Sequence, residues 1–357
     1  MGLIVDIVTG LAWGDEGKGK IAAGLASTGD YDMVARWSGG SNAGHTIHVP
    51  GKDGEEKVYK THIVPCGVLF GIKSVIGPGC VVNVEKLMRE ISLLEKAGHN
   101  GSLVKVSPRA HIVTNDHIRE DSGEFKERLG TTGNGIAPAY RDKYGRTGKL
   151  AKDYLPAHMI WDEVLGKKVL CEGAQGCWLD VDYGNYPYVT SSNTTPAGAL
   201  SLGFSHYSIR DVYGVAKMYD TRVGIDPSFD PEPENHARFK KDLAVAGKEI
   251  GVTTGRARDT NFLNVDKLIK AINITGSNKI YINKLDVFST AVKLSYLNAT
   301  MGHKEEWPFF YNGVLRRYDS EEAMLQSITS AIRKNAAFPI DHIEFLDSPS
   351  WTQRGTF

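Results

Sequence analysis

Cysteine, net charge and long apolar runs are what this sequence has little of. Only 4 of its 357 residues are cysteine and no two form a C-x-x-C pair, so a disulfide framework is excluded and the thiols are expected to be reduced and structural. Lys+Arg and Asp+Glu both count 42, so the global positive field of nucleic-acid-binding proteins is absent. No apolar run approaches the ~18 residues of a membrane span, and no basic segment precedes an apolar one at the N-terminus. These absences predict a cytoplasmic protein with neither a nucleic-acid nor a membrane partner.

The predicted elements follow the order strand, loop, helix, repeated along the chain. Short apolar runs rich in β-branched residues predict strands at residues 3–8, 168–171, 279–282 and 343–346. Helices are predicted from residue 21, over 83–97 with Asn83 as the cap, and over 320–332 with Asp319 or Ser320 as the cap. This order favours an α/β fold with a mostly parallel central sheet and helices on both faces, in one domain of residues 1–357 with insertions.

A glycine-rich loop follows the first predicted strand. Residues 14–20 read GDEGKGK, which fits G-x-x-x-x-G-K, so the loop predicts a P-loop-like nucleotide-binding site. Ile21 stands where an ordinary P-loop has the Ser or Thr that binds Mg²⁺. A metal therefore needs other oxygen ligands, and the carboxylate of Asp15 within the loop is the first candidate.

Three further segments carry residues suited to nucleotide chemistry. Residues 39–46 form a second glycine-rich loop that contains His45, a side chain able to act as an acid near neutral pH. Residues 253–258 combine hydroxyls with paired arginines, whose guanidinium groups suit carboxylates and phosphates. Residues 283–286 read NKLD after a predicted strand, and a carboxylate there can accept both N1–H and N2–H of guanine.

Taken together, these segments resemble the adenylosuccinate synthetase family. The matching motifs run in family order over nearly the whole chain: WGDEGKGK at 13–20, NAGHT at 42–46, GTTG at 130–133, EGAQG at 172–176, YPYVTSSN at 186–193, TRVG at 221–224, TTGR at 253–256 and KLD at 284–286. The resemblance implies a ligase that joins L-aspartate to carbon 6 of a 6-oxopurine nucleoside monophosphate, driven by a nucleoside triphosphate. In that chemistry a base removes the N1 proton, the 6-oxygen attacks the γ-phosphate, and the aspartate amine then displaces phosphate.

The resemblance also assigns roles to individual residues. Asp15 resembles the general base and a Mg²⁺ ligand, His45 the acid that stabilises the transferred phosphoryl group, and the Gly44 carbonyl a second metal ligand. Gln175 is placed with the catalytic residues and with the substrate contacts. The donor phosphates are expected at Gly14, Glu16, Gly17, Lys18, Gly19 and Lys20. The monophosphate substrate is expected at Asn42, Ala43, Thr132, Arg146, Gln175, Thr190, Val223 and Arg256.

The remaining assignments concern aspartate, the donor base and a partner subunit. Aspartate is expected at Val252, Thr253, Thr254, Gly255, Arg256 and Arg258, and the donor base at Lys284, Asp286, Ser348 and Pro349. Arg146 resembles the arginine that reaches the substrate phosphate of a neighbouring subunit, which implies a homodimer with shared sites.

Departures from the family pattern bear on the substrates. The chain is compact, and the family's GPFPTE run after TRVG is replaced by IDPS at 225–228. A viral branch of the family uses dGMP in place of IMP, and this compact chain resembles it, so dGMP is the favoured substrate, in host cytoplasm, and IMP the alternative. Guanine carries an extra N2 amine, and Asp15 or Asp220 is the predicted acceptor, unless Asp220 is a turn carboxylate in solvent. Because DSPSW at 347–351 replaces the family's STGP, the donor is left open between GTP and ATP or dATP.

Two other classes fit part of the pattern. A regulatory nucleotide hydrolase would share the P-loop and NKxD, but Ile21 and the block at 186–193 argue against it. A nucleotide-binding protein without catalysis has no need of both Asp15 and His45.

Overall fold

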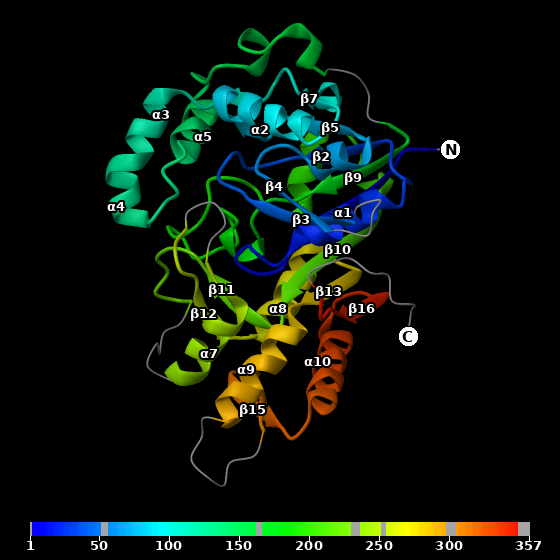
Figure 1. The fold of residues 1–357 in the computed structure, drawn as a ribbon, viewed down its shortest axis with the longest axis vertical. Helices are drawn as coiled ribbons and strands as arrows, with labels where there is room; N and C mark the ends of the chain where they lie inside the picture. Colours follow the sequence, from blue (N-terminus) through cyan, green and yellow to red (C-terminus); the bar gives the residue numbers. More distant parts are fainter. Residues whose placement is uncertain are drawn as a thin grey trace.

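Eight parallel strands form the centre of the molecule (Figure 1). The computed structural model describes residues 2–50, 56–161, 166–229, 236–250, 255–297 and 305–348. Every neighbouring pair in this sheet is parallel. The strands lie in the order β16 (His342–Phe345), β13 (Lys279–Asn283), β10 (Ile209–Lys217), β1 (Ile4–Gly10), β9 (Lys168–Glu172), β2 (Met33–Arg36), β5 (Lys73–Ile76) and β7 (Val104–Val106).

The central strand β1 is buried on both faces. Ile7 packs with Val169 of β9 in one apolar cluster, whereas the next residue, Val8, belongs to a cluster that includes Ile21 and Leu87. Since neighbouring side chains of a strand point to opposite faces, the sheet is covered on both sides. Helices α1 (Lys18–Ser27) and α2 (Val84–Lys96) supply Ile21 and Leu87 on one face.

The opposite face is covered by helices from the C-terminal half. Helices α8 (Val265–Thr275) and α10 (Glu321–Asn335) pack with Ile280 and Ile282 of β13, while Tyr281 between them joins the cluster of α1 and α2. The prediction of helices on both faces is therefore confirmed, as is the parallel sheet.

The other helices and strands surround this core. The helices are α3 (Asn115–Glu120), α4 (Lys126–Leu129), α5 (Ile136–Gly145), α6 (Pro196–Ala199), α7 (Ala237–Gly247) and α9 (Leu285–Leu297). The strand pairs are β3 (His45–Pro50) with β4 (Glu56–Thr61), β6 (Val81–Val82) with β8 (His111–Ile112), β11 (Tyr219–Arg222) with β12 (Asp259–Phe262), and β14 (Trp307–Tyr311) with β15 (Val314–Tyr318). No helix in the described part of the chain is both long enough and apolar enough to cross a bilayer.

The capping residues expected from the sequence start the helices. The Asn83 side chain accepts the Lys86 N–H at the start of α2, and Ser320 rather than Asp319 accepts the Ala323 N–H at the start of α10. The helix expected from Ile21 begins three residues earlier, at Lys18, because Gly17 has a left-handed backbone (φ 92°) that ends the loop. All four cysteines are free and buried, as expected.

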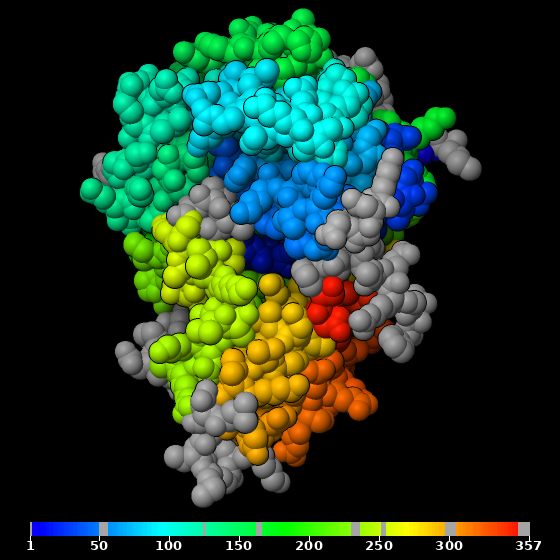
Figure 2. Space-filling view, viewed as in Figure 1, coloured from blue at the N-terminus to red at the C-terminus, as the bar shows by residue number. Residues whose placement is uncertain are grey.

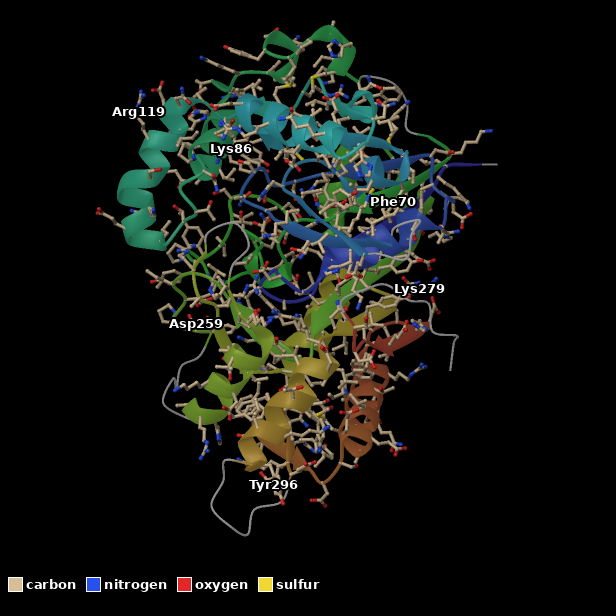
Figure 3. All side chains as sticks on the ribbon, in the orientation of Figure 1. Phe70, Lys86, Arg119, Asp259, Lys279 and Tyr296 are labelled. Atoms are coloured by element: carbon tan, nitrogen blue, oxygen red, sulfur yellow. The ribbon has the colours of Figure 1, made fainter. Side chains whose placement is uncertain are left out.

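The sheet places most of the predicted site at one edge. The glycine-rich loop follows the carboxyl end of β1, the segment with Gln175 follows β9, the loop with His45 follows β2, and Lys284 follows β13. Ligands of open parallel sheets bind beyond the carboxyl ends of the strands. In Figure 3 the labelled Lys279, at the amino end of β13, and Asp259, at the start of β12, lie on opposite sides of the view.

Candidate active site

A cleft of about 620 Å³ opens beyond the carboxyl ends of the strands. It is lined by the turns after β1, β2, β9 and β13 together with segments near residues 130, 222, 250 and 256. In Figure 2 the darkest-blue atoms of the N-terminal segment lie recessed between lighter blue atoms above and yellow and orange atoms below. Segments that are distant in the sequence therefore meet around the glycine-rich loop.

Two glycines allow this loop to approach its neighbours. A Cβ at Gly17 would lie 2.8 Å from Nδ2 of Asn283, and a Cβ at Gly19 would lie 2.8 Å from the Cβ of His45. Both distances are too short for a side chain. The backbone N–H groups at the start of α1 therefore lie close to both β13 and His45, where a helix N-terminus favours a bound anion.

The Glu16 carboxylate organises the loop from within. It is buried and accepts N–H groups of Ala12 at 3.1 Å and Gly14 at 2.9 Å. The same carboxylate pairs with Nζ of Lys18 at 2.5 Å. Glu16 was predicted to bind the donor phosphates. Its carboxylate is directed into the loop and would repel an anion, so only the backbone N–H of Glu16 is suited to bind a phosphate. Its side chain instead holds Lys18 at the cleft.

Lys20 connects the loop with the predicted donor-base segments. Its Nζ donates to Oδ1 of Asn283 at 3.1 Å and to the carbonyl of Ser348. Burial lowers the pKa of Lys20 to about 8, although Asp286 and other nearby carboxylates favour the charged ammonium. Lys20, Asn283 and Ser348 thus form one polar cluster on the donor side of the cleft.

Asp15 is held by an arginine at the opposite side of the loop. Nε of Arg258 donates to Oδ2 of Asp15 at 2.8 Å, and Nη1 of the same guanidinium donates to Oε2 of Glu249 at 2.5 Å. Glu249 is buried, whereas about a third of the Asp15 side chain is exposed to the cleft. The Asp15 backbone is left-handed (φ 60°), which is uncommon for a residue other than glycine.

His45 is buried against a carboxylate from the end of β9. Its Nδ1 lies 2.5 Å from Oε1 of Glu172, whose Oε2 accepts the Cys66 N–H at 2.7 Å. Burial would raise the pKa of Glu172, but His45, Arg36 and the Cys66 N–H together lower it to about 2. Burial lowers the pKa of His45 despite this carboxylate. A neutral ring that donates Nδ1–H to ionised Glu172 leaves Nε2 as the nitrogen that can interact with a ligand.

The third side of the cleft offers polar groups beside Gln175. Gln175 also has a left-handed backbone (φ 56°), and its Oε1 is buried without a hydrogen-bond partner among the described residues. Nη2 of Arg222 donates to the Tyr188 carbonyl at 2.7 Å, and burial lowers the pKa of this guanidinium. Nη1 of Arg256 donates to the Gly130 carbonyl at 2.8 Å. Gln175 Oε1 and two nearby guanidinium groups suit a polar, anionic ligand.

Asp220 lies elsewhere. It is buried in β11, and its Oδ2 accepts the Asn264 N–H at 3.1 Å next to the start of α8. Burial raises the pKa of Asp220 to about 7. It does not contribute to the lining of the cleft among the described residues, and it does not face solvent. The prediction that Asp220 receives a purine amine is therefore not supported, and neither is the alternative of a solvent-facing turn.

Most predicted site residues meet in this single cleft. From the first two loops they are Gly14, Asp15, Glu16, Gly17, Lys18, Gly19, Lys20, Asn42, Ala43, Gly44 and His45. From later segments they are Thr132, Gln175, Thr190, Val223, Arg256, Arg258, Lys284, Asp286 and Ser348.

A few predicted residues do not meet there. Arg146 is exposed at the C-terminal end of α5 and Gly255 is also exposed, and neither lines the cleft. Val252, Thr253, Thr254 and Pro349 lie outside the described residues. The predicted contact of Arg146 with a partner subunit stays a prediction.

Three buried residues with a clear part in the site were not assigned a role from the sequence. Glu172 stands in the recognised motif at 172–176, and its position directly after the predicted strand at 168–171 was the available signal. Arg222 stands likewise within TRVG. Glu249 precedes the paired arginines by several residues, and no local spacing connects it with Arg258; only the fold brings them together.

The cleft fits a magnesium ion that is shared with phosphate groups. Among the described residues no three His, Cys, Asp or Glu side chains gather as a metal site. Asp15 and the backbone of Gly44 both line the cleft beside the two loop lysines. One carboxylate and a carbonyl are too few for a cage made by the protein alone, but Mg²⁺ is commonly bound by one or two carboxylates together with substrate phosphates.

Comparison with known proteins agrees with this arrangement. A family model described as adenylosuccinate synthetase matches residues 7–164 and 156–309. The adenylosuccinate synthetase of Halothermothrix orenii is 38% identical over 341 residues, 79% of this chain and 77% of that protein. The enzyme of Picrophilus torridus is 38% identical over 336 residues, 80% and 77% of the two chains.

Two solved structures share the fold. The fully ligated adenylosuccinate synthetase of Plasmodium falciparum has a TM-score of 0.74 at 28% identity and covers 98% of both chains. The succinoaminodeoxyadenylate synthetase of cyanophage S-2L, bound to dGMP and dATP, has a TM-score of 0.68 at 21% identity over 98% of this chain and 94% of that chain. With the family model and the curated relatives, these matches show that the chain belongs to the adenylosuccinate synthetase family, ligases that form a C–N bond between aspartate and a purine nucleotide.

Proposed function

We propose that this cleft joins L-aspartate to carbon 6 of IMP, with Asp15 as the base and His45 as the acid. The observation that carries the proposal is the meeting of Asp15, His45 and Gln175, from the turns after three different strands, with both loop lysines around one cleft. These residues supply a carboxylate for the ring proton, an imidazole for the phosphoryl group and cations for the phosphates.

The first step is a phosphoryl transfer. Asp15 takes the N1 proton of the 6-oxopurine, and the electron pair left on the ring makes the 6-oxygen a nucleophile. That oxygen attacks the γ-phosphorus, and the bond to the β-phosphate oxygen breaks, so a nucleoside diphosphate leaves. Lys18, Lys20 and the first N–H groups of α1 bind the donor phosphates, while Nε2 of His45, in its protonated form, donates to an oxygen of the transferred group.

The second step forms the C–N bond. The aspartate amine attacks carbon 6, and the bond between carbon 6 and the phosphorylated oxygen breaks, so inorganic phosphate leaves with the electron pair and the amine loses a proton. Arg256 and Arg258 bind the aspartate carboxylates, since guanidinium groups pair with carboxylates through two parallel hydrogen bonds.

Mg²⁺ belongs to the proposal as a partner of the donor phosphates. Asp15 and the Gly44 carbonyl would hold it, and it would supply neutralisation of the charge that develops on the phosphate oxygens.

IMP is proposed over dGMP for two reasons. Curated relatives of 34–38% identity are named adenylosuccinate synthetases. Moreover, of the two predicted acceptors for the extra guanine amine, Asp220 lies outside the cleft, and Asp15 is already assigned to the N1 proton. Leaving that amine without a partner would cost about 1–3 kcal/mol.

dGMP remains the second candidate. The segment IDPS at 225–228, in place of the family's usual run, directly follows Val223 and Gly224 at the cleft, so the surroundings of the substrate differ from the family pattern. The fold is also shared with the cyanophage synthetase, whose structure contains dGMP.

The donor is proposed to be GTP. Asp286 lines the cleft in the first turn of α9, and a carboxylate there can accept two N–H groups of guanine. ATP and dATP are the alternatives, because the segment at 347–351 departs from the family pattern.

We also propose a homodimer in which Arg146 reaches the partner's substrate phosphate. Mixing the inactive variants Arg146→Ala and Asp15→Asn should then restore part of the activity, because mixed dimers contain one site with neither substitution. No recovery on mixing would contradict shared sites.

One assay tests the reaction, the substrate and the donor. The purified protein is given IMP, GMP or dGMP with L-aspartate, Mg²⁺ and GTP, ATP or dATP, and the succinylated product is identified by mass. Product from IMP, absent without aspartate, supports the proposal. Product from dGMP alone supports the second candidate, and phosphate release that does not depend on aspartate would indicate a nucleotide hydrolase.

A further inference from the structure

Glu249, which the proposed reaction steps do not use, sits at the centre of a buried polar cluster. Three groups donate to its carboxylate: Nη1 of Arg258 at 2.5 Å, the Tyr219 hydroxyl at 2.5 Å and Nζ of Lys217 at 3.4 Å. The side chains of Glu249 and Lys217 are 1% and 3% exposed. Burying these charges is costly unless they are paired with good geometry.

The cluster ends at the cleft. Arg258 donates to Glu249 with Nη1 and to Asp15 with Nε, so the charges alternate from Lys217 through Glu249 and Arg258 to Asp15. Exposure rises along the same path, from 1–3% at Lys217 and Glu249 to 10% at Arg258 and 32% at Asp15. One side of the Arg258 guanidinium is thus fixed in the interior while the other side meets the cleft.

The backbone around Glu249 supports this arrangement. The Arg258 N–H donates to the Glu249 carbonyl at 3.0 Å, so the two residues are joined by main chain as well as by side chain. A Cβ at Gly247 would lie 2.5 Å from the Tyr219 hydroxyl and 2.9 Å from Oε1 of Glu249. The absence of a side chain at position 247 leaves room for the hydrogen bond between Tyr219 and Glu249.

We propose that Glu249, supported by Tyr219 and Lys217, is a positioning residue that fixes the Arg258 guanidinium at the aspartate end of the cleft. Because one side of the guanidinium is bound to Glu249, only its other side pairs with Asp15. This rests on the proposed function, in which Arg258 binds an aspartate carboxylate. Without the interior carboxylate, Arg258 has only Asp15 as an ionic partner within this cluster, so the guanidinium is less constrained and less available to the incoming amino acid. Fixing such a group before binding reduces the ordering cost of binding.

The chain contains a matched control at the other end of the sheet. Asp6 is fully buried and accepts from Nε of Arg210 at 3.0 Å and from the Tyr31 hydroxyl at 2.6 Å. It has the same kinds of partners as Glu249 but lies in β1 on the side away from the cleft. Asp6→Asn therefore measures what a buried carboxylate with an arginine and a tyrosine contributes to stability alone.

The experiment compares Glu249→Gln, Tyr219→Phe and Asp6→Asn with the wild-type protein, measuring kcat, KM for L-aspartate, KM for the nucleotide and the thermal midpoint. We expect Glu249→Gln to raise KM for aspartate by roughly tenfold or more and KM for the nucleotide by less than about twofold. Tyr219→Phe, which keeps every charge of the cluster, should raise KM for aspartate by about two- to fivefold. Asp6→Asn should lower the thermal midpoint and leave both KM values within about twofold.

The outcomes separate the inference from the proposed function. If the wild-type protein forms no succinylated product, the proposed function is wrong and the inference is lost with it. If the wild type turns over and Glu249→Gln keeps KM for aspartate within about twofold, only the inference is overturned, and Glu249 is structural like Asp6. If Glu249→Gln does not fold, Tyr219→Phe decides, and an unchanged KM for aspartate overturns the inference.

Discussion

The two ends of the central sheet contain the same polar unit in different surroundings. At the amino ends of the strands, Asp6 is shared by Arg210 and Tyr31. At the carboxyl ends, Glu249 is shared by Arg258 and Tyr219. Both carboxylates are almost completely buried, so both units must be well paired to be tolerated.

The two units differ in the exposure of the arginine and in its second ionic partner. Arg210 is 45% exposed, and its second ionic partner is the adjacent Asp211 of β10, which does not line the cleft, so the unit ties strands together. Arg258 is 10% exposed, and its second partner is Asp15, a cleft residue in a strained backbone conformation. The same chemistry therefore joins strands at one end of the sheet and places a guanidinium group at the cleft at the other.

The same arrangement, a buried carboxylate that holds a cleft residue, occurs twice more at the carboxyl ends of the strands. Glu16 holds Lys18, Glu172 holds His45, and each of these two partners lines the cleft as Arg258 does. Hydrogen-bond donors held in place by buried carboxylates do not have to reorganise when an anionic ligand arrives, which is the preorganisation that favours charge development in a transition state. The comparison predicts that substitutions at the carboxyl end alter catalysis, while matched substitutions at the amino end alter stability alone.

The largest effects are expected at the two residues that are proposed to touch the reacting groups. Asp15→Asn removes the proposed base and His45→Ala removes the proposed acid, so each should lower kcat by at least ~10²-fold. Asp6→Asn, measured in the same succinylation assay, should retain its kcat. Near-normal turnover of either cleft variant would remove the role proposed for that residue and with it the contrast between the two ends.

Glu172→Gln should have the next largest effect. An amide in place of the carboxylate no longer stabilises a protonated His45 ring or favours the Nδ1–H form, so kcat should fall by roughly 10- to 100-fold with little change in KM for aspartate. Steady-state kinetics at constant pH gives the answer, with Glu249→Gln as the counterpart that raises KM for aspartate. Unchanged kcat would mean that the His45 ring is oriented without Glu172.

The Glu172 carboxylate is also expected to make the stability of the fold depend on pH. Because the pKa of Glu172 is about 2 in the folded chain and near 4.5 otherwise, its stabilisation is present above about pH 4.5 and is lost as the pH falls toward 2. The thermal midpoint of wild type should therefore fall more steeply between pH 5 and pH 3 than that of Glu172→Gln, by scanning calorimetry. Equal slopes would contradict an ionised Glu172 in the folded state.

Lys20 is expected to give a smaller, pH-dependent effect on donor binding. Its pKa of about 8 means that the ammonium loses its proton just above neutral pH, and a bound triphosphate favours the charged form. KM for the donor should therefore be nearly constant below pH 7 and rise by up to about tenfold between pH 7 and pH 9. Lys20→Arg, whose charge persists over this range, should flatten the profile; an equally steep rise in that variant would assign the titration to another group.

The strand-loop-helix order and the carboxyl-edge site could be predicted from the sequence because each depends on local pattern. The apolar run of β1 and the caps of α2 and α10 are readable within a few residues. Strands β2, β5 and β7 were not predicted, since runs of four residues or fewer lack a period that separates them from loops. The nine-residue strand β10 of the central sheet was not predicted either. The start of α1 was misplaced because the positive φ of Gly17, not the apolar pattern, sets the boundary.

The cleft-facing residues were found through motifs, whereas the residues behind them were not. Glu249 and Lys217 are 32 positions apart in the chain, so their contact arises only when β10 and the segment after α7 come together. Asp220 shows the converse: its place beside the TRVG motif indicated a site residue, but alternation along β11 directs its side chain toward the start of α8.

Asp220 is expected to affect stability and to have the smallest effect on turnover. Burial raises its pKa to about 7, so between about pH 4 and pH 7 the folded chain keeps a proton that the unfolded chain releases, and stability from this group falls as the pH rises. Asp220→Asn keeps an acceptor for the Asn264 N–H and does not titrate. From pH 5 to pH 8, wild type should lose about 2 to 3 kcal/mol relative to this variant, measured by denaturant unfolding at both pH values. The same variant should leave turnover of IMP and of dGMP unaltered, and a selective loss with dGMP would place the carboxylate in contact with the guanine amine during turnover and restore dGMP as the favoured substrate.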